Sequence, residues 1–154
     1  MFKKVLLIAT ASAVLGMTGC ASVPKANNEQ SAQAKLFPTP DEGNAGLYVY
    51  RNSFGGKALK KDIFVDGNCL GESADKMFFY TQVPGDKEHT IATESEFSPN
   101  KLVLDMKAGV NYFIRQYIKM GVFVGGANLE RVSEDVGKIE VAKLNMAENG
   151  QCSK

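Results

Sequence analysis

The chain has 154 residues and a formal net charge of +1, with 18 Lys and Arg against 17 Asp and Glu. This balance leaves no basic field to attract nucleic acid and no acidic field to attract cations, and the length suits one domain. A metal or other cofactor is not expected either, because zinc sites use three or four ligands at set spacings and the chain has a single histidine.

Residues 1–19 are typical of a bacterial signal peptide. Lys3 and Lys4 keep the amino end in the cytoplasm and precede an apolar run over residues 5–15. This run is about half of the roughly 20 residues that cross a bilayer, so a cleaved signal is favoured over a permanent membrane helix.

The signal ends in Met17-Thr18-Gly19-Cys20, which resembles the lipobox of bacterial lipoproteins. In that motif small residues admit the peptidase to the backbone, and the cysteine thiol receives a diacylglyceryl group. We predict cleavage before Cys20 and acylation of this residue, palmitate included, because two or more acyl chains anchor a protein stably. Ala21 in place of Asp suggests outer-membrane sorting, by resemblance to Gram-negative lipoproteins. The alternative is an ordinary signal peptide with a chance cysteine near its end.

Residues 20–44 are predicted to be the lipidated cysteine and a flexible tether. The stretch is rich in Ala, Asn, Gln, Ser and Lys, and Pro24, Pro38 and Pro40 interrupt it. About 20 flexible residues have an end-to-end distance of roughly 25 Å, enough to hold a domain just off the membrane surface. Leu36 and Phe37 are the apolar exceptions and are candidates for contact with the domain.

Residues 45–154 are predicted to be mainly β, as a single small β-sandwich of short antiparallel strands with one C-terminal helix. The strand at residues 47–51 is apolar on both faces and is expected to be central. Asp66-Gly67-Asn68 marks a hairpin, because Gly and Asn accept positive φ. Further strands are expected at residues 63–65, 69–72, 77–83, 88–95, 102–106 and 111–120.

The longest of these strands, residues 111–120, divides into a core face and a solvated face. Aromatic and Arg side chains on the solvated face are typical of binding hot spots, so this face is our candidate binding surface. The alternative, favoured because the C-terminal helix needs a packing surface, is that the helix covers these aromatic rings. The core face has Tyr112, Ile114, Gln116, Ile118 and Met120; the candidate binding surface has Phe113, Arg115, Tyr117 and Lys119.

The C-terminal helix is expected to begin after Ser133, which can cap it, with acidic residues in its first turn. Val136, Ile139 and Leu144 are expected to line its buried side. Before it, the glycine-rich residues 121–129 are expected to form a bent strand or loop lying against the sheet.

Cys69 and Cys152 remain once Cys20 is assigned to the lipid. In an oxidising periplasm such a pair commonly forms a disulfide, which here would tie the tail to an early hairpin. The alternative is two unpaired thiols, one in the core and one on a loose tail.

The segments GLYVYRN, IFVDGNCLGE, VPGDKEHTIATES, AGVNYFIRQ and LERVSEDVGK resemble, in this order, a family of bacterial lipoproteins known as domain-of-unknown-function family 2846. The resemblance covers most of residues 45–145. Two of the segments, IFVDGNCLGE and VPGDKEHTI, also resemble the small PEGA-type β-sandwich of envelope proteins. The resemblance implies a fold and a binding or structural module, and it brings no catalytic residues.

Catalytic chemistry finds little support in the residues. His89 is the only imidazole, and we assign it to closing the turn after Pro84-Gly85 by hydrogen bonds rather than to general-base catalysis. Glu94 and Glu96 share a strand face, where alternating charges are usually a solvated side rather than a glycosidase pair.

We therefore expect a non-enzymatic lipoprotein anchored to the outer membrane and facing the periplasm. Its role would be binding or structural, with the membrane, and an envelope protein or cell-wall component, as partners. The alternative is an inhibitor, accessory protein or enzyme that acts on cell-wall glycan or on envelope proteins.

Overall fold

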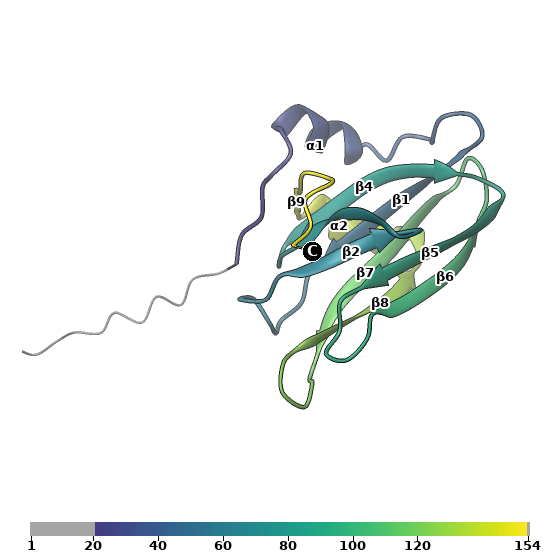
Figure 1. Ribbon diagram of the computed structural model, residues 1–154. Helices are drawn as coiled ribbons and strands as arrows, with labels where there is room; N and C mark the ends of the chain where they lie inside the picture. The colour runs from purple at the N-terminus through teal and green to yellow at the C-terminus, as the bar shows by residue number, and fades with distance from the viewer. Residues whose placement is uncertain (1–20, 154) are drawn as a thin grey trace, which may run out of the picture.

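Two sheets face each other in the computed structural model, which describes residues 21–153. The strand order is β8-β7-β1-β4-β9 in one sheet and β3-β2-β5-β6 in the other (Figure 1). The mainly β sandwich expected from the sequence is confirmed. The elements are α1 Asn28–Ala34, β1 Asn44–Arg51, β2 Lys61–Val65, β3 Asn68–Ser73, β4 Met77–Pro84, β5 Lys87–Thr93, β6 Asn100–Met106, β7 Asn111–Lys119, β8 Gly126–Val132, α2 Glu134–Ala142 and β9 Asn145–Met146.

Strand β1 is central, as its two apolar faces predict. It pairs antiparallel with β4 on one side, but parallel with β7 on the other, and β4 and β9 are also parallel. The expectation of antiparallel strands alone is therefore too simple. Leu47 and Val49 face the core between the sheets, whereas Tyr48 and Tyr50 face a second core under the helices.

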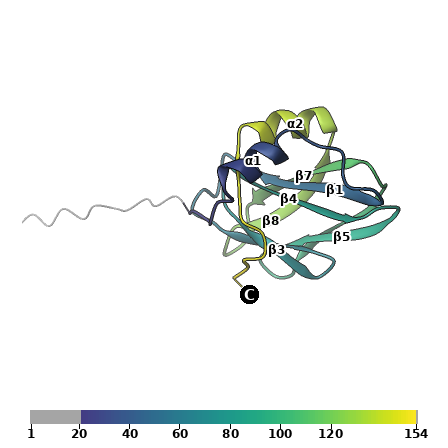
Figure 2. The ribbon, with the colours of Figure 1, turned by 90° about the horizontal axis from the view of Figure 1, so that it is seen from above.

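The helices lie together on the outer side of the five-stranded sheet. Figure 2 shows α1 and α2 on one side of the sandwich, over β1, β4 and β7, with β3 and β5 on the far side. The second core therefore joins the outer face of this sheet to both helices, and the molecule has three layers.

A short series of side-chain hydrogen bonds crosses the core between the sheets. Gln116 on β7 donates from Nε2 to Thr93 Oγ1 at 2.7 Å, and Ser73 Oγ donates to the Gln116 side-chain oxygen. Thr93 Oγ1 in turn donates to the carbonyl of Asp62 at 3.1 Å. Gln116 thus occupies the core face predicted for it because each of its polar ends has a partner.

The β2–β3 hairpin turns through Asp66 and Gly67, whose φ values of 51° and 81° are those of the predicted tight turn. His89 is buried beside it, with Nδ1 2.5 Å from Asp66 Oδ2 and Nε2 2.7 Å from the Pro84 carbonyl. Burial acts to raise the pKa of Asp66, but hydrogen bonds from Thr90 and His89 outweigh it and lower that pKa. Both ring nitrogens of His89 are therefore engaged in closing the turn, as expected.

The N-terminal segment is ordered on the sandwich, and the flexible tether predicted for residues 20–44 is wrong for residues 21–44. The Ala26 N–H donates to the Met146 carbonyl at 3.0 Å, and the Glu148 N–H donates to the Pro24 carbonyl at 3.0 Å. Val23 is buried in the core between the sheets. The polar composition of residues 21–44 suggested a flexible tether because this segment is held mainly by backbone hydrogen bonds and has few apolar side chains.

Helix α2 begins after Ser133, whose Oγ accepts from the Val136 N–H as predicted. Its buried side differs from the prediction, because Val136 and Ile139 are 48% and 59% exposed. Gly137 and Val141 face the sheet instead. A Cβ on Gly137 would lie 2.2 Å from Phe113 Cγ, so the glycine lets the helix backbone approach the sheet.

The C-terminal tail is fastened at two neighbouring points. Cys69 on β3 and Cys152 form the predicted disulfide across 83 residues, with a Cα–Cα distance of 6.1 Å. Next to it, Ser153 donates from its backbone N–H and its hydroxyl to the buried Asp62 carboxylate, at 3.0 Å and 2.8 Å. Among the described residues, no helix is long and apolar enough to cross a membrane.

Candidate functional site

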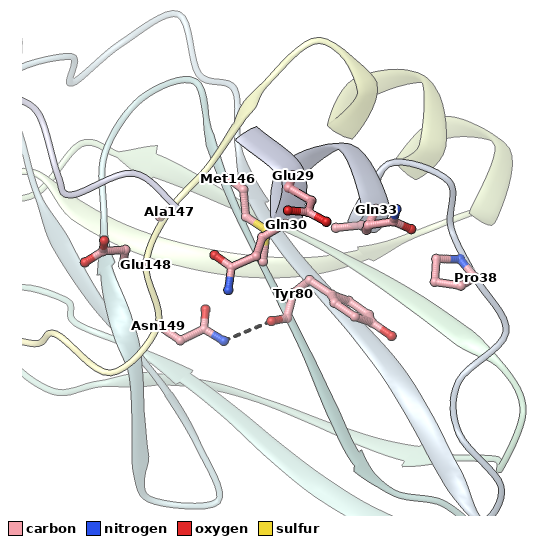
Figure 3. A pocket seen from close by; sticks show the side chains of 10 residues that line it. Glu29, Gln30, Gln33, Pro38, Tyr80, Met146, Ala147, Glu148 and Asn149 are labelled. Carbon is pink, nitrogen blue, oxygen red and sulfur yellow. Dashed lines mark hydrogen bonds between the residues drawn. The ribbon is translucent and has the colours of Figure 1, made fainter. Parts of the chain in front are cut away.

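A pocket of about 660 Å³ opens between α1 and the chain that follows α2. Both of its walls come from the ends of the chain, and its floor is the outer face of β4 (Figure 3). A volume of this size is within the range of ligand sites. The lining residues are Glu29, Gln30, Gln33, Ala34, Pro38, Tyr80, Met146, Ala147, Glu148 and Asn149.

The floor of this pocket, which we call the α1 pocket, rests on stacked aromatic rings. The Tyr80 ring lies 4.5 Å from the Tyr48 ring, and Tyr48 donates its hydroxyl to the Ala34 carbonyl at 2.8 Å. Burial raises the pKa of both tyrosines, so both remain neutral at physiological pH. The Tyr80 hydroxyl is shielded from solvent beside the Gln82 side chain. The Tyr80 ring therefore contributes an apolar surface.

Amide and carboxylate groups form the rim. Figure 3 shows Glu29, Gln30 and Gln33 on the α1 side and Glu148 and Asn149 on the other, with Tyr80 between them. The Asn149 side chain donates to the Tyr80 carbonyl at 2.9 Å, which fixes the tail against β4. The lining has two carboxylates and no Lys or Arg, so it suits a neutral or cationic group with an apolar part.

The structure divides the candidate binding surface of β7. Phe113 is 1% exposed, with its ring 4.8 Å from Tyr48 and 5.8 Å from Phe37. The prediction of Phe113 as a binding residue is therefore wrong, and the alternative of packing under the helices is correct for this position. Helix α2 covers it because Gly137 leaves room for the ring.

The remaining residues of that surface stay accessible beside α2. Arg115 and Tyr117 are half-buried and line a second pocket of about 570 Å³, where Arg115 pairs with Glu130 at 3.2 Å. Tyr117 accepts a hydrogen bond from Asn128 at 3.1 Å, and Lys119 is exposed at the end of the strand. Arg115 and Tyr117 already have these partners, and the pocket is smaller than the α1 pocket, which we therefore take as the better-formed candidate.

Sequence reasoning missed the α1 pocket because it assigned α1 to a tether. A signal was present: Asn27 followed three residues later by Gln30 is a helix-start pattern, and Asn27 Oδ1 does accept from the Gln30 N–H at 2.8 Å. Within residues 21–153, no cluster of His, Cys, Asp and Glu is arranged to hold a metal ion.

Comparison with known proteins gives a family without an assigned activity. Residues 41–127 match the family described as "Protein of unknown function (DUF2846)". An uncharacterized protein of Haemophilus influenzae is 56% identical over 131 residues, which cover 85% of this chain and 77% of the relative. No solved structure matches the chain.

Proposed function

The chain belongs to the DUF2846 family, and from its own residues we propose that it is a lipoprotein of the bacterial outer membrane with a non-catalytic binding role. In this proposal Cys20 carries the lipid, the folded domain faces the periplasm, and an envelope protein docks in the α1 pocket. We also propose that the β2–β5 region is related to PEGA-type modules, in keeping with the Asp66-Gly67 turn and the buried His89 beside it.

Two independent features support the location. Met17-Thr18-Gly19-Cys20 has the composition of a lipobox, although it lies outside the described residues. The Cys69–Cys152 disulfide is of a kind that persists in oxidising compartments such as the periplasm.

A non-catalytic role is supported by His89, because both nitrogens of the only imidazole are committed to structural contacts.

Replacing Cys20 by Ala is expected to release the protein from the membrane. Without the thiol no diacylglyceryl group can be attached, so the acyl chains that anchor the protein in this proposal are lost. Fractionation of cells that express wild-type or Cys20→Ala protein measures this. Wild-type protein in the soluble periplasmic fraction would contradict the proposed anchor.

The α1 pocket is the observation that carries the binding role. Its apolar floor of Tyr80, Met146 and Ala34 suits one inserted aliphatic or aromatic side chain. The amides of Gln30 and Gln33 can bond a peptide backbone, and the nearby carboxylates favour an adjacent Lys or Arg. We therefore propose a short apolar and basic segment of an envelope protein as the occupant, in preference to an anionic ligand.

A photo-crosslinker at Gln30 in living cells is expected to capture one dominant protein. Adding Gln33→Trp should reduce the adduct several-fold, because the indole would cover the pocket from the exposed side of α1. Ala32→Trp is the matched control, since Ala32 is exposed on the same helix but does not line the pocket. An adduct that both Trp variants leave unchanged would argue against the pocket as the docking site.

A further inference from the structure

Large apolar side chains are exposed together in three loops at one end of the sandwich. The loops join β1 to β2, β5 to β6 and β7 to β8, and Figure 1 shows all three at its lower end. Contiguous exposed apolar surface of this kind marks an interaction site. We call it the apolar loop end; its residues, 56% to 101% exposed, are Phe54, Phe97, Met120, Val122, Phe123 and Val124.

Charged side chains fix the backbone of two of these loops. Arg51 is fully buried and donates from Nη1 to the Leu59 carbonyl at 2.7 Å and from Nη2 to the Gly56 carbonyl. The Glu96 carboxylate accepts from the backbone N–H groups of residues 122, 123 and 124. These contacts fix the backbone of loops whose large apolar side chains are exposed.

The three loops form one continuous surface. A pocket between the β1–β2 and β7–β8 loops is lined by Leu59, Ile118 and Phe123 among others. The third loop joins them through Glu96 and through the Ala127 N–H, which donates to the Glu94 carbonyl at 3.3 Å. The three loops are therefore joined in a single platform, from which the exposed apolar side chains project.

The N-terminal end of the described chain lies at this platform. The Ala21 N–H donates to the carbonyl of Lys57, in the β1–β2 loop, at 3.2 Å. Ala21 directly follows Cys20, so a lipid on Cys20 would be attached to the domain next to the exposed loops. Two exposed lysines, Lys57 in the β1–β2 loop and Lys119 beside Met120, can attract anionic headgroups, whereas Lys60 pairs with Glu72 at 3.2 Å.

We propose that the apolar loop end is a membrane-docking surface, which lies in the interface of the same bilayer that holds the acyl chains of Cys20. This proposal rests on the proposed lipidation of Cys20. Phe, Met and Val side chains with flanking Lys have the composition of interfacial membrane binders. The lipid then attaches the protein, and the loops fix its orientation, so that the β4–β5 turn at the opposite end of the sandwich points away from the membrane.

Tryptophan reporters test this docking, because the natural chain has no Trp. Phe123→Trp places a reporter in the apolar loop end, and Val110→Trp places one at an exposed apolar position of the opposite end. Each full-length protein is purified from membranes, its acylation is measured by mass spectrometry, and it is reconstituted into vesicles of phosphatidylglycerol and phosphatidylethanolamine with brominated acyl chains. The Phe123→Trp emission is expected to shift to the blue and to be quenched roughly threefold, and the Val110→Trp emission to stay unchanged.

The outcomes separate the two proposals. Acylated protein whose Phe123→Trp reporter is not quenched would overturn membrane docking and leave the proposed anchor intact. The exposed loops would then be a protein-binding surface. Protein without acyl groups would overturn the anchor and, with it, the docking that rests on it. Equal quenching of both reporters would also overturn docking, since it would mean that the protein has no preferred orientation.

Discussion

Replacing Cys69 and Cys152 by Ser is expected to lower the free energy of unfolding by about 4 kcal/mol. The bond spans 83 residues, so breaking it restores a large loop-closure entropy to the unfolded chain. The tail keeps weaker attachments, which include the hydrogen bonds from Ser153 to Asp62 and from the Gly150 N–H to the Leu70 carbonyl. A loss of this size is a large part of the roughly 5–15 kcal/mol that stabilises a typical domain.

Urea unfolding followed by circular dichroism measures this loss, with wild-type protein compared with and without reductant. Reduced wild type should match the double Ser variant, and the variant should not respond to reductant. Ser153→Ala is the matched control in the same tail, where the loss of one hydroxyl bond to a carboxylate costs roughly 2 kcal/mol. Identical unfolding of oxidised and reduced wild type would show that the disulfide contributes nothing.

The disulfide also bears on the α1 pocket. Glu148 and Asn149 form one wall of the pocket, and they lie only a few residues before Cys152. The Gly150 N–H donates to the Leu70 carbonyl at 2.8 Å, which continues the attachment of the tail along β3. The tail that closes the pocket is therefore held in place from its far end, and loss of the disulfide should weaken crosslinking at Gln30 as well.

Local patterns were sufficient to predict most of the sandwich. Alternation places His89, Ile91 and Thr93 on one face of β5, and the structure shows that all three are buried. Asp66-Gly67 predicts the hairpin because both residues accept positive φ. The disulfide followed from counting cysteines once Cys20 was set aside. These features depend on residues near one another in sequence, or on a count with few outcomes.

The predictions that the structure corrects share a different cause, because each depends on which helix or strand covers a given face of the sheet. The alternation in β7 placed Phe113 and Arg115 on one face correctly, but nothing local shows that α2 covers only the first of them. Residues 121–129 were expected against the sheet; β8 begins at Gly126, and Val122 and Phe123 before it are exposed. An apolar stretch is readily assigned to a core, and only the tertiary structure shows that it projects from a loop.

At Gly137 the tertiary packing is expected to reverse the usual effect of a Gly→Ala substitution on stability. Gly→Ala at an exposed helix position stabilises a protein by about 1 kcal/mol. At Gly137 we expect the opposite, a loss of about 2 kcal/mol, because the new Cβ would lie within 2.5 Å of three Phe113 atoms. Either α2 must move away from the sheet or the ring must leave its stack with Tyr48, and both open the second core.

Thermal unfolding of Gly137→Ala measures the sign of this effect, and Ala142→Gly measures helix propensity alone at an exposed position of α2. A double-mutant cycle that combines Gly137→Ala with Phe113→Ala tests whether contact with the Phe113 ring causes the loss of stability. Truncation removes two of the three clashing atoms and leaves Cβ, so Gly137→Ala should cost less in that background, with a coupling of roughly 1 kcal/mol or more. If Gly137→Ala raises stability in the wild-type background, the close packing of α2 on Phe113 cannot be what orients the helix, and Val136 and Ile139 are exposed for another reason.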